Sequence, residues 1–129
     1  MNKIERFEDI IAWQKARALT KKIYSCAKVG AFARDYGLND QIQRASVSSM
    51  SNIAEGFERG GDKEFLQFLS TSKGSCGEVK SHLYVALDQE YITPVSFDEL
   101  YGQASEVSRL LSGFMTYLRG SPLRGSKYR

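Results

Sequence analysis

The chain has 129 residues, of which 42% are hydrophobic and 26% are charged, and it contains 2 prolines. This composition is that of one globular domain and excludes collagenous and disordered chains. The net charge is only +3, but six basic residues and no acid lie between Ile10 and Arg34, and residues 119–129 again hold basic residues without an acid. Such an uneven charge bears on the choice of partner and not on the fold.

Targeting segments and a disulfide framework are not expected either. No run of about 18 apolar residues occurs, and the first residues are polar with Glu8 and Asp9 close behind, unlike a signal peptide. We therefore expect a cytoplasmic protein with no membrane partner. Cys26 and Cys76 lack the close spacing of zinc ligands, so we expect reduced core cysteines, no metal and no cofactor.

The first predicted helix covers about residues 8–28. Advancing each residue by about 100° places the apolar residues between Ala12 and Ala27 on one arc. The opposite arc is basic, and we predict that it binds nucleic acid through Lys15, Arg17, Lys21, Lys22 and Lys28. Three large apolar residues project onto that same outer arc, where a monomer has no reason to place them. We therefore predict a contact with a neighbouring copy through Phe7, Ile10 and Ile11, together with Trp13 at the edge of the core arc.

The second predicted helix covers about residues 37–57 and has a small, polar seam. Its four serines between residues 46 and 51 would weaken an isolated helix, because short hydroxyl side chains compete for backbone hydrogen bonds. They should therefore be bonded to something. One interpretation is close helix packing with a buried polar network of Arg44, Asn52 and Glu55, which could extend across a subunit boundary. The other interpretation is a polar pocket or an RNA-contacting face.

Two further helices show heptad spacing. The third follows Gly60-Gly61 with Asp62 as the predicted N-cap, and its apolar stripe runs from Phe65 to Ala86 at alternating steps of four and three residues. The fourth is predicted to begin at a capping box over residues 96–99, with Val95 and Leu100 as its hydrophobic staple. Its stripe runs from Phe97 to Leu118 in the same rhythm.

Short connections determine the predicted arrangement of these helices. Because each connection has eight residues or fewer, antiparallel neighbours are favoured, and we predict an all-α, up-down-up-down antiparallel four-helix bundle over residues 1–119. Residues 120–129 lack periodicity and are predicted to form a mobile basic tail. We expect Arg124, Lys127 and Arg129 of this tail to contribute to nucleic-acid binding.

Residues suited to catalysis are sparse. His82 is the single histidine, and it lies one helical turn beyond Glu78, so the two side chains could pair as an acid-base dyad. A salt-bridged or interface histidine is the preferred interpretation, because active sites in helical bundles usually gather several carboxylates or histidines. We therefore expect no enzymatic activity.

Several short motifs, taken together, resemble one known family. They are FEDIIAWQKA at residues 7–16, QIQRA at residues 41–45 and SNIAEG at residues 51–56, followed by Glu64-Phe65, Gly74-Ser75 and Glu78. In combination they are similar to the four-helix bundle proteins associated with 23S rRNA intervening sequences, over residues 4–118. The chain carries Ser49-Met50 where that family commonly has Ile-Pro, so the second helix lacks the usual proline kink.

The resemblance implies a ring-like homopentamer and does not imply a catalytic activity. Relatives include accessory proteins of diversity-generating retroelements, which bind a reverse transcriptase and nucleic acid through a basic surface. We therefore predict a homopentamer that binds RNA or DNA weakly and with little sequence specificity, with a nucleic-acid-processing protein as a further partner. In a ring the N-terminal contact must meet a different surface of the next copy. We predict that this surface includes Ser46, Met50 and Phe57.

The alternative function is a protein-protein scaffold without a nucleic-acid role of its own. It is supported by the apolar N-terminal contact surface and by an acid-rich run that would attract a basic partner. The acids of this run are Asp88, Glu90, Asp98, Glu99 and Glu106.

Overall fold

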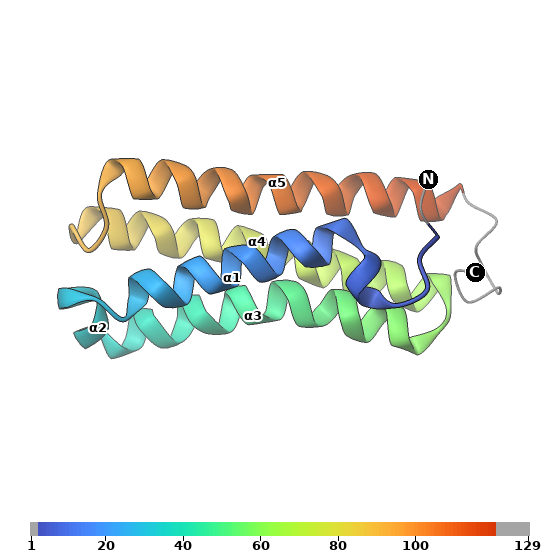
Figure 1. Cartoon of the computed structure of the whole chain (residues 1–129), viewed down its shortest axis with the longest axis horizontal. Coiled ribbons are helices and arrows are strands. Elements are labelled where there is room, and N and C mark those ends of the chain that lie inside the picture. The colour runs from blue at the N-terminus through green and yellow to red at the C-terminus, as the bar shows by residue number, and fades with distance from the viewer. Residues whose placement is uncertain (1–2, 121–129) are drawn as a thin grey trace.

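Four long helices lie side by side along the length of the molecule (Figure 1). The computed structural model describes residues 3–120. Its elements are a 3-10 turn, η1 (Phe7–Asp9), and the helices α1 (Ile11–Ala27), α2 (Gly30–Arg34), α3 (Tyr36–Arg59), α4 (Asp62–Asp88) and α5 (Pro94–Arg119). Contacts join α1 to α3 and α5, and α4 to the same two helices. The predicted all-helical class is confirmed, and the described residues contain no strand. The short helix α2 was not anticipated.

Helix α1 begins three residues later than the sequence pattern indicates. The Asp9 carboxylate accepts hydrogen bonds from the backbone N–H groups of Glu5 and Arg6, at 3.0 and 3.2 Å. These bonds hold a 3-10 turn, after which Ile10 is extended with φ −80° and ψ 120°. Its side chain therefore points inward and is only 3% exposed. The prediction that Ile10 lies on the outer surface of a continuous helix is wrong.

The starts of α4 and α5 also differ from the prediction. At α5 the Thr93 hydroxyl accepts a bond from the Ser96 N–H at 3.1 Å, and Pro94 occupies the first turn. A proline at this position lacks only an N–H that would be unpaired anyway. The helix therefore starts ahead of the predicted capping box, and Val95, 79% exposed, is not a hydrophobic staple. At α4 the N-cap is Gly61, so Asp62 is the first helical residue.

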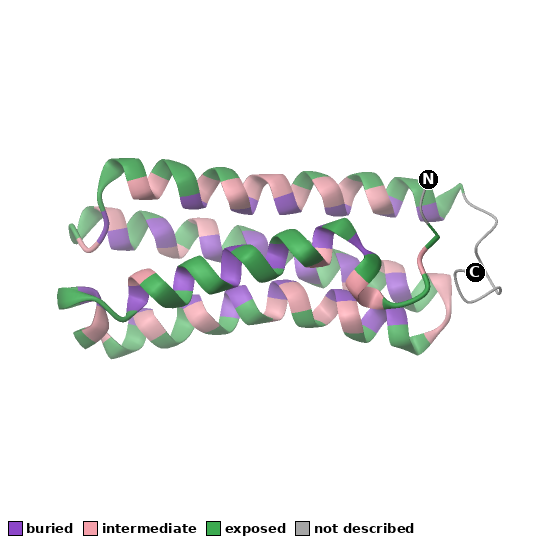
Figure 2. Ribbon diagram, viewed as in Figure 1, coloured by how far each residue is buried: buried purple, intermediate pink, exposed green. Residues whose placement is uncertain are grey.

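The heptad stripes of α4 and α5 do form the core, as Figure 2 shows along the inner sides of the helices. Every stripe residue of α4 is buried, and in α5 only Phe97 and Phe114 are half-buried. The core divides into two apolar clusters. One includes Ile10, just before α1, and Leu118 on α5, and the other includes Leu19, Ile42 and Leu83.

A layer of buried hydroxyl groups lies near the boundary between the two clusters, which on α3 falls between Ala45 and Ile53. We call it the hydroxyl layer, and its members are Thr20, Ser46, Ser49 and Ser72, with Ser48 and Ser75 beside them. The Thr20 hydroxyl lies 2.8 Å from the Ala16 carbonyl oxygen and 2.9 Å from that of Ser46. The Ser49 hydroxyl donates to the Ser46 carbonyl, and the Ser72 hydroxyl donates across to α3 at the Ser49 carbonyl. These bonds satisfy hydroxyl groups that would be costly to bury alone.

Helices α3 and α4 approach closely at Gly56. A Cβ atom added to Gly56 would lie 2.6 Å from the Cβ atom of Phe68 and 2.8 Å from a ring carbon of Phe65. Only glycine allows these two helices to meet at this distance. Helix α3 is continuous from Tyr36 to Arg59.

Candidate nucleic-acid interface

The predicted basic residues of α1 are all exposed, but they fall into two groups. Lys15 and Lys22 lie beside α5, where Lys15 pairs with Glu106 at 3.9 Å and Lys22 pairs with Glu99 at 2.7 Å. These carboxylates neutralise much of the charge that the first helix presents on that side. Exposed pairs of this kind contribute less than about 1 kcal/mol to stability, so they mainly reduce the local potential.

The second group forms a stripe on the opposite side of α1, which we call the α1 basic stripe. Its members are Arg17, Lys21 and Lys28, spaced so that they share one helical face. The Arg17 guanidinium lies 5.8 Å from the centre of the Trp13 ring. Within residues 3–120, Lys21 and Lys28 form no ion pair. This stripe is the part of α1 that keeps its positive charge available to a ligand.

An open, polar depression lies next to this stripe, on the surface that α1 shares with α3. It is lined by Tyr24 of α1 and by Gln43, Arg44, Val47 and Ser51 of α3, among others. Arg44 pairs with Asp40 at 3.0 Å while most of its side chain remains exposed. The α1 basic stripe therefore has polar and aromatic neighbours that suit a nucleic-acid backbone.

The predicted buried network of Arg44, Asn52 and Glu55 is wrong. Arg44 and Glu55 lie on the exposed side of α3, and Glu55 pairs with Arg59 one turn further on at 3.1 Å. Asn52 bonds to the carbonyl and hydroxyl oxygens of Ser48, both at 2.9 Å. The buried polar groups of α3 are instead the serines of the hydroxyl layer, whose hydroxyl groups bond to backbone carbonyl groups.

Some residues predicted to form the contact surface at the start of α1 are not available to a neighbouring copy. Ile10 is buried within the chain, and Phe7 packs edge-on against Trp13 with ring centres 5.1 Å apart. The predicted opposing surface is also partly unavailable, because Ser46 and Phe57 are buried inside the same copy. Of that surface, only Met50 is half-buried.

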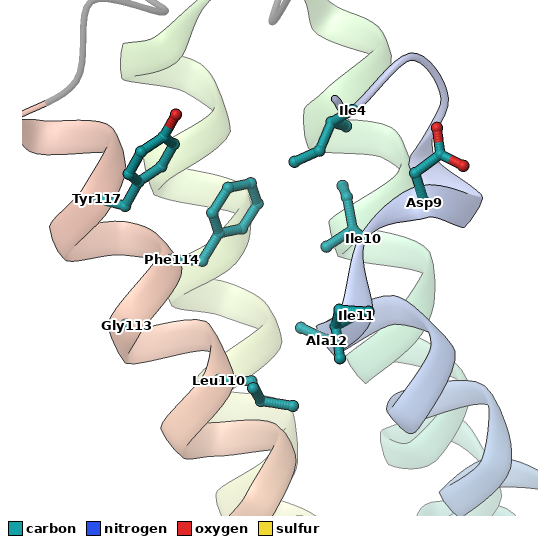
Figure 3. Close-up of a pocket in the computed structure, with 9 residues that line it drawn as sticks. All are labelled: Ile4, Asp9, Ile10, Ile11, Ala12, Leu110, Gly113, Phe114 and Tyr117. Carbon is teal, nitrogen blue, oxygen red and sulfur yellow. The ribbon is translucent and has the colours of Figure 1, made fainter. Parts of the chain in front are cut away.

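An apolar groove nevertheless lies at this end of the molecule, as Figure 3 shows. Side chains of the N-terminal segment and of the start of α1 face those of α5 across a pocket of about 390 Å³. Ile11 is 52% exposed and Tyr117 is 39% exposed. We call this the N-terminal groove, and it is lined by Ile4, Asp9, Ile10, Ile11, Ala12, Leu110, Gly113, Phe114 and Tyr117.

An aromatic patch at the other end of α5 was missed at the sequence level. The rings of Tyr84, Phe97 and Tyr101 lie within 6 Å of one another, with centre distances of 4.9, 5.4 and 5.9 Å. The Lys80 ammonium lies 5.1 Å from the centre of the Tyr101 ring. The four-residue spacing of Lys80 and Tyr84, and of Phe97 and Tyr101, is the signal that could have revealed it.

The remaining titratable candidates do not converge on one site. Burial raises the pKa of the Cys76 thiol to about 11 and also raises the pKa of the Cys26 thiol, so both are protonated near neutral pH. His82 Nε2 is buried without a hydrogen-bond partner in the described part of the chain, and it forms no ion pair there with Glu78. No group of three or more potential metal ligands occurs within residues 3–120. Three residues of the tail that were predicted to bind nucleic acid, Arg124, Lys127 and Arg129, lie outside the described residues.

Comparison with known proteins identifies the family. A sequence profile described as 23S rRNA-intervening sequence protein matches residues 8–113. The chain belongs to this family. The structure of this family member is similar to that of a protein with unknown function from the S23 ribosomal protein family of Bacteroides thetaiotaomicron, with a TM-score of 0.73 and 20% identity, covering 81% of this chain and 97% of that chain. At this identity the likeness shows a shared fold. No curated protein matches the chain.

The most specific motif of this 23S rRNA-intervening sequence family member has a packing role. In the Asn-Ile-Ala-Glu-Gly segment, Asn52 bonds to Ser48, Ile53 is fully buried and Gly56 allows α4 to approach. None of these side chains reaches the α1 basic stripe. None of the helices within residues 3–120 combines the length and apolar character needed to cross a membrane.

Proposed function

We propose that this family member is a non-enzymatic, nucleic-acid-binding protein that acts as an up-down-up-down antiparallel four-helix bundle assembled into a homopentameric ring. RNA or DNA would bind with little sequence specificity along the α1 basic stripe. The observation that carries this proposal is that Lys21 and Lys28 are exposed and form no ion pair within the described residues. The description of the family, which refers to 23S rRNA intervening sequences, supports RNA as the first ligand to test.

The two groups of basic residues make this proposal specific. A phosphate that approaches Lys15 or Lys22 must compete with Glu106 or Glu99, whereas a phosphate at the stripe meets no such competitor. The affinity should fall as the salt concentration rises. For each phosphate that the protein neutralises, the fall should be about 0.7 to 0.9 log units per log unit of salt. A ring would repeat the stripe in every copy, so weak contacts would add up along one nucleic acid.

The test is a gel shift with structured RNA and duplex DNA over a range of salt concentrations. Removing Lys21 and Lys28 together by substitution with Gln should reduce the slope of log affinity against log salt by about 1.4 to 1.8 for each copy that contacts the nucleic acid, as expected for two lost phosphate contacts per copy. The matched double variant, with Gln at Lys15 and Lys22, should change the salt dependence of the affinity less. Lys63→Gln on α4, which removes one exposed charge elsewhere, serves as the control. The absence of a complex at low salt, or equal effects of the two double variants, would contradict the proposal.

The N-terminal groove is our candidate for the contact between copies. Its supporting observation is the exposure of Ile11 and Tyr117 on an apolar surface, which a monomer has no reason to display. Ile11→Asp should yield a smaller particle in size-exclusion chromatography with light scattering, with an unchanged helical circular dichroism spectrum. Val29→Asp, at an exposed valine near the other end of α1, is the control. A monomeric unmodified chain would refute the assembly, and an unaltered oligomer of Ile11→Asp would refute the interface.

A further inference from the structure

The aromatic patch of α4 and α5 is separate from both surfaces discussed above. It consists of Tyr84, Phe97 and Tyr101, and Tyr84 is 51% exposed. The neighbouring Val85 is also exposed. Aromatic rings that stay at the surface and already accept a cation, as Tyr101 does from Lys80, are suited to bind further cationic groups.

Two carboxylates flank the patch. Asp88 lies one helical turn beyond Tyr84 on α4, and Asp98 lies three residues before Tyr101 on α5, so each acid shares a helical face with one of the rings. Both acids are exposed, and neither forms an ion pair within residues 3–120. Unpaired carboxylates beside the rings repel phosphate groups and attract cations. This charge argues against a nucleic acid as the occupant of the patch.

We propose that this aromatic patch binds an arginine-rich segment of a partner protein. A guanidinium group can stack on a ring and at the same time donate hydrogen bonds to a carboxylate, which a compact ammonium group does less well. Tyr84 and Phe97 supply ring surface, and Asp88 and Asp98 supply acceptors within one turn of it. The proposal concerns a different ligand and different helices from the nucleic-acid site, so either one can fail without the other.

Lys80 makes the proposal more specific, because it acts as an internal competitor. Its ammonium nitrogen lies over the Tyr101 ring, 5.1 Å from the ring centre. An incoming guanidinium must displace this ammonium group or share the patch with it. Lys80→Gln should therefore strengthen binding of an arginine-rich peptide. Lys73→Gln removes the same charge from α4 seven residues earlier, and Lys73 lies over no aromatic ring of residues 3–120.

The experiment measures binding of a fluorescent eight-residue oligoarginine peptide to the full, nuclease-treated chain by anisotropy. Tyr84→Ala should weaken binding by about three- to tenfold, and Asp98→Asn should weaken it and flatten its salt dependence. Tyr36→Ala and Glu58→Gln change an exposed tyrosine and an exposed acid on α3 and should have little effect. Circular dichroism of each variant confirms that the helices are retained.

Three results would overturn the proposal. The first is the absence of peptide binding at low salt. The second is an equal gain for Lys80→Gln and Lys73→Gln, which would show attraction by net charge alone. The third is a loss of single-stranded RNA binding on Tyr84→Ala with peptide binding unchanged, which would assign the patch to nucleic acid. A larger gain for Lys80→Gln, together with losses at Tyr84 and Asp98, supports it.

Discussion

Substituting Gly56 by alanine tests whether the close approach of α3 and α4 stabilises the fold. In a helix, alanine is favoured over glycine by about 1 kcal/mol, so propensity alone predicts a more stable protein. The new methyl carbon would, however, lie 2.6 Å from Phe68 Cβ and 2.8 Å from a ring carbon of Phe65. The Phe68 Cβ atom is attached directly to the α4 backbone and cannot rotate away. Relieving the overlap must therefore move one helix, at a cost of about 1–3 kcal/mol.

The matched control is Gly77→Ala on α4, where an added Cβ meets nothing within 4 Å. Both substitutions gain the same helical propensity, so the difference between them isolates the packing cost. Urea unfolding followed by circular dichroism, at one protein concentration, should show Gly77→Ala stabilised and Gly56→Ala less stable than it by about 1–3 kcal/mol. Equal midpoints for the two variants would refute the argument.

Three further predictions follow from individual contacts. Thr93→Ala should lower the free energy of unfolding by about 1 kcal/mol because it removes the N-cap of α5, whereas Ser96→Ala should have almost no effect; urea unfolding of both variants shows which residue is the cap. Thr20→Val should lower it by about 1–2 kcal/mol by removing the buried hydroxyl beside two carbonyl oxygens, and retained stability in the same assay would contradict the importance of the hydroxyl layer. Because burial raises the pKa of Cys76 from 9.0 to about 11, the folded chain holds this proton while the unfolded chain loses it, so stability should fall as the pH rises from about 9 to about 11. Cys76→Ala should reduce that loss in unfolding measured against pH.

The sequence allowed the apolar stripes to be predicted well and the helix starts poorly. The stripe from Phe65 to Ala86 was correct because a three-four spacing reports directly which side of a long helix is buried. The start of α1 was misplaced because the Asp9 carboxylate captures two backbone N–H groups, and a regular projection takes no account of such local competition. At α5 the capping box predicted at residues 96–99 was wrong, because the Thr93 hydroxyl, three residues earlier, accepts the bond from the Ser96 N–H.

The candidate site could be predicted only at the level of a helix face. All basic residues of α1 were correctly expected at the surface, but their division depends on which carboxylates of α5 lie opposite. Lys15 and Glu106 are ninety-one positions apart in the sequence, so no local pattern reports their pairing. The four-residue spacings within α4 and within α5 could show an aromatic face on each helix, but the sequence does not show the alignment that brings the rings of the two helices together.

The hydroxyl layer and Gly56 both favour one alignment of the helices along their length. A heptad stripe repeats every seven residues, so the apolar stripe of α4 alone would also accept α3 shifted by two turns. Such a shift would move the Ser72 hydroxyl away from the Ser49 carbonyl and set it against an apolar cluster, where an unpaired buried hydroxyl costs about 1–3 kcal/mol. A chain with this layer replaced by alanine and valine would keep its helices but populate several alignments. Surfaces made from two helices, such as the N-terminal groove, would then differ from copy to copy.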